Sequence, residues 1–108
     1  MKEITTAQFE AEVLQCNVPV LVDFYTESCP PCRMMSPILT EIEEDSAGVY
    51  KIVKVDAAAD GQLASSFRVS SVPTFVLFHR GGAIGQITGA RSKKEMQKWI
   101  SESIAGAS

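Results

Sequence analysis

Long hydrophobic runs are missing from this 108-residue chain, and so are clusters of basic residues. No apolar stretch comes near the roughly 20 residues that a membrane-spanning helix requires, so we expect no membrane partner. The formal net charge is −3, from 10 Lys and Arg against 13 Asp and Glu. A mildly acidic chain without a basic run binds nucleic acid or anionic lipid poorly, and we expect neither as a ligand.

Cysteine is scarce as well, at three residues. A small secreted domain stapled by disulfides carries more cysteines, usually in even number, so that class is excluded. The first residues lead directly into polar, amphipathic sequence without the apolar segment of an export signal. We therefore expect a cytoplasmic, reducing location. There, Cys29 and Cys32 in one Cys-Pro-Pro-Cys tetrapeptide indicate redox chemistry or metal binding.

The composition that remains is that of an ordinary folded domain. Hydrophobic residues make up 45% of the chain and charged residues 21%, which excludes a disordered polypeptide. The length suits one domain with one core, and the sequence shows no repeat, linker or low-complexity segment. We expect a single domain over residues 1–108.

Two apolar segments have the pattern of strands that are buried on both faces. Residues 18–25 and 74–79 are nearly continuous runs of β-branched, aromatic and aliphatic side chains. A further strand is expected at 49–55, and Gly81-Gly82 predicts a turn into a hairpin partner at 83–88. Helical periodicity and capping residues predict helices at 7–15, 30–47, 60–67 and 92–104.

The predicted element order is β-α-β-α-β-α-β-β-α. Helices between the early strands imply parallel crossovers, whereas the last two strands form an antiparallel hairpin. We expect an α/β fold with a mixed central sheet and helices on both faces. Asp23 is the single charge inside a buried strand. A carboxylate there must be neutralised or paired, which marks it as a candidate functional residue.

The cysteine pair follows a buried strand and opens a helix, a placement that resembles thioredoxin-like redox motifs. Other blocks are similar to that family in order and spacing, from about residue 4 to residue 104. They comprise residues 20–25, 29–37, 54–56, 72–75 and 81–89. The resemblance implies the thioredoxin fold and a monomeric protein-disulfide reductase. Its partners would be disulfide-containing client proteins and a thioredoxin reductase or other dithiol donor, with the redox-active disulfide in place of any cofactor.

Each cysteine has an expected role. Cys29 lies at a helix N-terminus, where the helix dipole and free N–H groups stabilise a thiolate, so it is the expected nucleophile. Cys32, one turn later, is expected to resolve the mixed disulfide by attacking Cys29. The resemblance implies that Asp23 is the buried general base for Cys32, and that Lys54 is its cationic neighbour.

The resemblance also implies a substrate-binding surface around the cysteines. Pro73 corresponds to the cis-proline of the family. The backbone of Val72 would pair with an extended client segment, in a short strand-addition contact. The remaining members of this apolar rim are Pro30, Pro31, Gly89 and Ala90. A rim of this kind fits broad substrate choice, because it recognises backbone and demands little of client side chains.

The sequence departs from the usual Trp-Cys-Gly-Pro-Cys of the family at two positions. Ser28 replaces the tryptophan and Pro30 replaces the glycine. Because Pro30 and Pro31 have no N–H, only amides from Cys32 onward can donate to the Cys29 sulfur, which weakens support for its thiolate. We still expect a reductant. The missing tryptophan removes an apolar wall, so we expect a different electron donor or a narrower set of clients.

Other functions remain open at this point. Cys16, Cys29, Cys32 and His79 are nominal zinc ligands, although structural zinc sites usually show two close pairs and Cys16 lies on the apolar stripe of the first helix. An Fe–S cluster shared across a dimer is a related possibility. A non-catalytic interaction module on the same scaffold is another. A disulfide oxidase or isomerase would use the same cysteines in an oxidising compartment.

Overall fold

Five strands form one mixed sheet, in the order β1-β3-β2-β4-β5, in the computed structural model of residues 1–107. Ser108, the last residue of the expected domain, lies outside the described residues. The strands are β1 (Lys2–Glu3), β2 (Val20–Tyr25), β3 (Lys51–Asp56), β4 (Thr74–His79) and β5 (Gly82–Thr88). The first three run parallel, β4 is antiparallel to β2, and β5 is the hairpin partner of β4. The predicted order and mixed sheet are confirmed, although the sequence patterns give residue ranges for four of the strands and not for β1.

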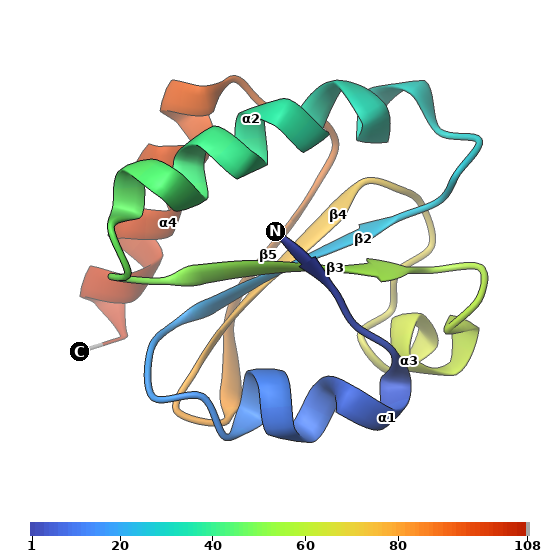
Figure 1. Cartoon of the computed structure of the whole chain (residues 1–108), viewed down its shortest axis with the longest axis horizontal. Coiled ribbons are helices and arrows are strands. Elements are labelled where there is room, and N and C mark those ends of the chain that lie inside the picture. Colours follow the sequence, from blue (N-terminus) through green and yellow to red (C-terminus); the bar gives the residue numbers. More distant parts are fainter. Residues whose placement is uncertain (108) are drawn as a thin grey trace.

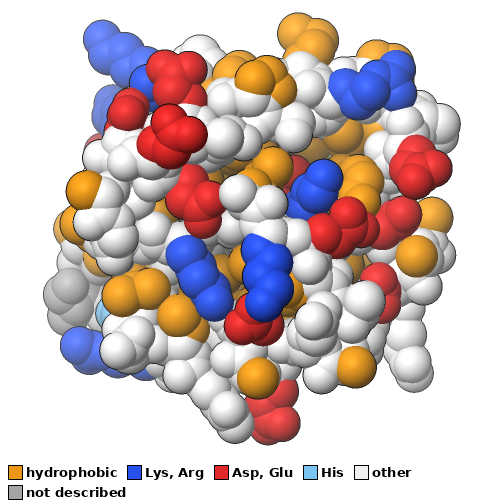
Figure 2. Space-filling view, in the orientation of Figure 1, with side chains coloured by type: hydrophobic (Ala, Val, Ile, Leu, Met, Phe, Trp, Pro, Cys, Tyr) orange, Lys and Arg blue, Asp and Glu red, His pale blue; other side chains and the backbone are white. Residues whose placement is uncertain are grey.

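Helices cover both faces of this sheet (Figure 1). α2 (Pro30–Ser46) and α4 (Lys93–Gly106) lie on one face. α1 (Thr6–Phe9), the π-helix η1 (Glu10–Leu14) and α3 (Gly61–Ser66) lie on the other. Within the part of the chain that the structure describes, no helix is long and apolar enough to cross a membrane. Figure 2 shows acidic and basic side chains interspersed on the face it presents.

Each face of the sheet has its own hydrophobic core. Val22 and Phe24 of β2 pack in the cluster with α1 and α3, whereas Leu21 packs in the cluster with α2 and α4. Successive residues of a strand point to opposite faces, so a strand covered on both sides has a continuous apolar sequence. Asp23 follows the same alternation and lies on the α2 face, with 2% of its surface exposed. A charged residue therefore occupies a core position.

The first helix differs in detail from its prediction. The sequence predicts one helix over 7–15, whereas the structure has a short α-helix that changes at Glu10 into a π-helix ending at Leu14. Phe9 and Val13 are nevertheless buried, as the apolar stripe predicts. The periodicity identifies the buried side of the segment but does not distinguish the two hydrogen-bonding patterns, because both leave these side chains on one face.

α2 carries the cysteine pair to the end of the sheet. Cys29 is its N-cap, and Pro30 and Pro31 occupy the first helical positions, where a missing N–H costs little. The helix ends at Ser46, shortly before Gly48, whose φ of 85° suits a glycine after a helix C-terminus. Both ends agree with the prediction. The cysteines consequently lie just beyond the carboxyl end of β2.

Candidate active site

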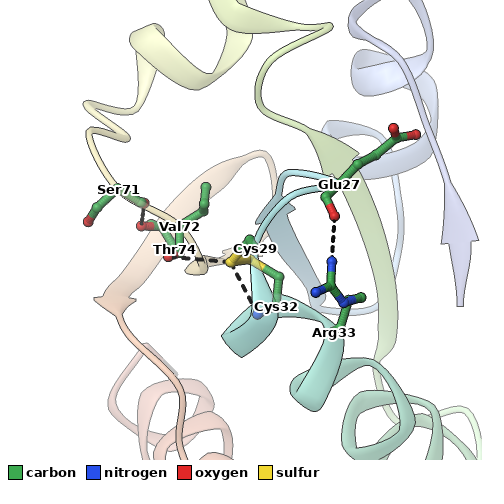
Figure 3. The surroundings of a disulfide bond; sticks show 7 residues. All are labelled: Glu27, Cys29, Cys32, Arg33, Ser71, Val72 and Thr74. Carbon is green, nitrogen blue, oxygen red and sulfur yellow. Dashed lines mark hydrogen bonds between the residues drawn. A yellow bond between two sulfur atoms is a disulfide. The ribbon is translucent and has the colours of Figure 1, made fainter.

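Cys29 and Cys32 are joined by a disulfide at the N-terminus of α2 (Figure 3). Their Cα atoms are 5.2 Å apart, and both residues are buried. The N–H of Cys32 donates to the Sγ of Cys29 at 3.2 Å. Pro30 and Pro31 have no amide to offer, so Cys32 is the first helical residue whose N–H reaches this sulfur.

The loop before β4 lies against Cys29 (Figure 3). The Val72–Pro73 peptide is cis, the isomer that the resemblance implies. The carbonyl oxygen of Val72 lies 3.8 Å from the Sγ of Cys29. The N–H of Gly89 donates to the carbonyl oxygen of Pro73 at 2.8 Å, which places the end of β5 beside the same loop. Ala90 follows directly and is exposed, as are Pro30 and Pro31 on the helix. The expected rim residues therefore come from three segments that meet near Cys29.

Polar side chains that the sequence does not single out fix these loops. The hydroxyl of Thr74 donates to the carbonyl oxygen of Ser71 at 2.7 Å and lies 3.1 Å from the hydroxyl of Thr88. The guanidinium of Arg91 donates to the carbonyl oxygens of Thr88 and Gly89, at 3.0 and 3.1 Å. A threonine in a strand and an arginine in a loop have no distinctive spacing. No sequence signal identifies them.

Asp23 lines a pocket together with Cys32, and its acidity is altered. Burial raises its pKa to about 7, and the positive charge of Lys54 lowers it by a smaller amount. Its Oδ1 atom is buried and has no hydrogen-bond partner among residues 1–107. A pocket of about 350 Å³ is lined by both Asp23 and Cys32. The carboxyl group can therefore exchange a proton at neutral pH within a space that reaches the second cysteine.

Lys54 pairs in strand register with Asp23 and lines the same pocket. Its ammonium lies 4.0 Å from Oε1 of Glu3 and 5.1 Å from the ring centroid of Tyr25. The Tyr25 hydroxyl donates to Oε2 of Glu3 at 2.7 Å. The sequence identifies Lys54 but neither Glu3 nor Tyr25, because their contact depends on the pairing of β1 with β3.

Comparison with known proteins shows which family the sequence resembles over most of its length. The Thioredoxin family model matches residues 1–102. The chain is 37% identical over 101 residues to a thioredoxin of Rickettsia bellii, covering 94% of this chain and 96% of that protein. It is 35% identical over 102 residues to thioredoxin 1 of a Nostoc species, covering 94% and 95% of the two chains.

The chain belongs to the thioredoxin family.

A longer relative joins two activities in its name. A protein of Mycobacterium leprae named bifunctional thioredoxin reductase/thioredoxin is 37% identical over 102 residues. The match covers 94% of this chain and 22% of that protein. Family membership and the Cys29–Cys32 disulfide together identify the protein as a thiol–disulfide oxidoreductase that reduces protein disulfides.

The other two nominal metal ligands, Cys16 and His79, lie at the opposite end of β2. Cys16 precedes that strand and is a free cysteine, half-buried against the α1 and α3 core. His79 ends β4, whose neighbouring Phe78 pairs with Val20 at the start of β2. Among residues 1–107, no group of three or more His, Cys, Asp or Glu side chains could hold a metal ion. Cys16 and His79 therefore do not join the cysteine pair in one cluster.

Proposed function

We propose that the protein reduces client disulfides with Cys29 as nucleophile, Cys32 as resolving thiol and Asp23 as the proton acceptor for the second step. The observation that carries the proposal is the pocket lined by both Asp23 and Cys32, the second cysteine of a disulfide at a helix N-terminus. A helix N-terminus stabilises the thiolate of Cys29, and Asp23 is a base whose pKa, about 7, is close to neutral.

The first step starts from the dithiol form, in which Cys29 has released its thiol proton to solvent. The Cys29 thiolate attacks one sulfur of the client disulfide, so that a Cys29–client bond forms and the client S–S bond breaks. The client thiolate that leaves takes up a proton from solvent. The N–H of Cys32, which donates to the Cys29 sulfur at 3.2 Å, supports the attacking thiolate, and so does the dipole of α2.

The second step releases the reduced client. The carboxylate of Asp23 accepts the proton of the Cys32 thiol through the shared pocket. The Cys32 thiolate attacks Sγ of Cys29, the internal disulfide forms, and the second client sulfur leaves as a thiolate that is then protonated. Two electrons and two protons pass from the dithiol to the client. Lys54 contributes a positive charge that favours the carboxylate form of Asp23.

Client recognition is proposed to use backbone more than side chains. The Val72 peptide next to cis Pro73 offers hydrogen-bonding groups to an extended client segment. The Val72 carbonyl lies 3.8 Å from the reactive sulfur, so a segment paired there would hold its disulfide near Cys29. The rest of the contact surface is Pro30, Pro31, Gly89 and Ala90. Because these residues are small or cyclic, they exclude few types of client side chain from the surface.

The oxidised protein needs a dithiol electron donor, and we propose a thioredoxin reductase in the cytoplasm. The Mycobacterium leprae relative whose name includes both activities supports this choice of partner. Ser28 is exposed beside Cys29, where the family usually has a tryptophan, so the contact with the donor loses apolar surface. We further propose that the chain works as a monomeric single domain without a bound metal or organic cofactor.

Reduction of insulin by dithiothreitol tests this function. We expect the protein to accelerate insulin precipitation catalytically, at protein concentrations far below those of insulin. A Cys16→Ala variant should retain the full rate, since Cys16 lies against a core at the far end of β2. No acceleration over dithiothreitol alone would contradict the proposal, and an equal loss in Cys16→Ala would place the reactive thiol elsewhere.

A further inference from the structure

Glu3, Lys54 and Asp23 are aligned across three neighbouring strands. Glu3 of β1 is in register with Lys54 of β3, and Lys54 is in register with Asp23 of β2. Residues in register on adjacent strands point to the same face of a sheet. All three side chains line the pocket that reaches Cys32. One ammonium group therefore stands between two carboxyl groups.

The structure holds that ammonium toward Glu3. Nζ of Lys54 lies 4.0 Å from Oε1 of Glu3 and 5.1 Å from the centre of the Tyr25 ring. The other Glu3 oxygen accepts a hydrogen bond from the Tyr25 hydroxyl at 2.7 Å, which fixes the carboxylate next to the ring. Asp23, in contrast, has an oxygen without any hydrogen-bond partner among the described residues.

We propose that Glu3 and Tyr25 form a clamp that holds Lys54 away from Asp23, and that this keeps the buried carboxyl group free of a close ion pair and able to receive the Cys32 proton. The inference rests on the proposed role of Asp23 as proton acceptor. An ammonium in direct contact would stabilise the carboxylate and make it a weaker base. Glu3 and Tyr25 are thus positioning residues, which act on the reaction through Lys54.

The pocket is also lined by Arg33 and Glu27, but neither residue is paired in register with Asp23. Arg33 of α2 donates from its guanidinium to the backbone oxygen of Glu27 at 2.8 Å, which holds this cation at the pocket rim. Glu27 itself is exposed. The β4 residue in register with Asp23 is the uncharged Phe75. The cation in register with the buried acid is therefore Lys54, and the position of its ammonium is the variable that the clamp controls.

The test is a Glu3→Gln variant of the reduced protein. Glutamine keeps an oxygen that can accept the Tyr25 hydrogen bond but removes the negative charge that holds Lys54. We expect the pKa of Asp23, followed by carbon NMR of its carboxyl group, to fall by about 1, because an opposite charge at close range lowers a carboxyl pKa by that order. The pH midpoint of mixed-disulfide resolution should fall with it. Tyr25→Phe should give a smaller shift in the same direction, since the ring under Lys54 remains.

Two further variants separate the clamp from a general charge effect. Glu44→Gln removes a carboxylate from an exposed position near the end of α2 and should leave the Asp23 pKa unchanged. In a Lys54→Met background, Glu3→Gln should leave the Asp23 pKa where Lys54→Met alone puts it. An unchanged pKa in Glu3→Gln would overturn the clamp. An equal fall in the Lys54→Met background would also overturn it, because Glu3 would then act on Asp23 directly.

The proposed function fails by a different observation. If Asp23→Asn resolves mixed disulfides as fast as the parent protein at neutral pH, Asp23 is not the proton acceptor. The carboxyl titration of Glu3→Gln still decides whether the clamp sets the acidity of Asp23, because it requires no turnover.

Discussion

A Cys32→Ser variant should lose catalytic turnover completely and accumulate client proteins bound to Cys29. The serine hydroxyl is not ionised at neutral pH, so it cannot attack the mixed disulfide that the first step forms. Cys29 keeps its place at the N-terminus of α2, and the backbone N–H of residue 32 still reaches its sulfur. The first step therefore remains available while the second is removed. The product should be a disulfide-linked complex of about one client per protein chain, which dithiothreitol separates by reducing the mixed disulfide.

Non-reducing electrophoresis with a disulfide-containing client measures this outcome. Cys29→Ser should form no such complex, because the remaining Cys32 is deeper, at 4% exposed, and is not at the helix N-cap. Cys16→Ser in the Cys32→Ser background should leave trapping intact. Trapping that depended on Cys16, or that was equal in the Cys29 and Cys32 variants, would show that the nucleophile is wrongly assigned.

Replacing Asp23 by asparagine should raise the free energy of unfolding, relative to that of the parent protein, more in alkaline than in acidic solution. Burial raises the folded-state pKa of Asp23 to about 7 from an ordinary value of 3.8. Between these pH values the folded protein holds a proton that the unfolded chain has released. The contribution of Asp23 to the free energy of unfolding is therefore fully present below pH 3.8 and is lost as the pH rises through about 7. The loss amounts to about 4 kcal/mol, at about 1.4 kcal/mol per pH unit.

Asparagine cannot ionise, so the variant avoids this loss. Urea unfolding of both oxidised proteins near pH 4 and near pH 9 should show the free energy difference moving in favour of Asp23→Asn by about 4 kcal/mol. The exposed Glu44→Gln variant should show no such movement. The same difference at both pH values would mean that Asp23 titrates like an exposed carboxyl group, and the proposed base would lose its physical basis.

The central elements of the fold can be predicted from local sequence patterns. β2 and β4 are predicted because a strand covered on both faces has to be apolar throughout, and the single exception, Asp23, is conspicuous for the same reason. α2 is predicted from its stripe, its initial prolines and Gly48. These patterns involve residues that are close in the sequence, so they can be recognised without knowledge of tertiary contacts.

Other features of the site depend on long-range pairing. The meeting of Val72, Pro73 and Gly89 with Cys29 is implied by family resemblance, since no local pattern brings residue 89 to residue 73. The Glu3 and Tyr25 contacts with Lys54 require the register of β1, a two-residue strand without an apolar pattern. The switch from α- to π-helix at Glu10 has no signal in the apolar periodicity.

The active-site sequence bears directly on the direction of the reaction. The two prolines leave the Cys32 amide as the first helical donor to the Cys29 sulfur, and no histidine lies between the cysteines to stabilise the thiolate further. A weakly stabilised thiolate in the dithiol form favours electron donation, because a strong oxidant of this type owes its potential to a stabilised reduced form.

The reduction potential of the Cys29–Cys32 pair tests the central claim most directly. It is obtained by equilibrating the protein with glutathione couples of known ratio and measuring the oxidised fraction. A protein-disulfide reductase should give a value nearer to roughly −270 mV, that of thioredoxin, than to roughly −120 mV, that of the most oxidising member of this fold class. A value above about −180 mV, that of protein disulfide isomerase, would contradict the assignment and identify an oxidase or isomerase.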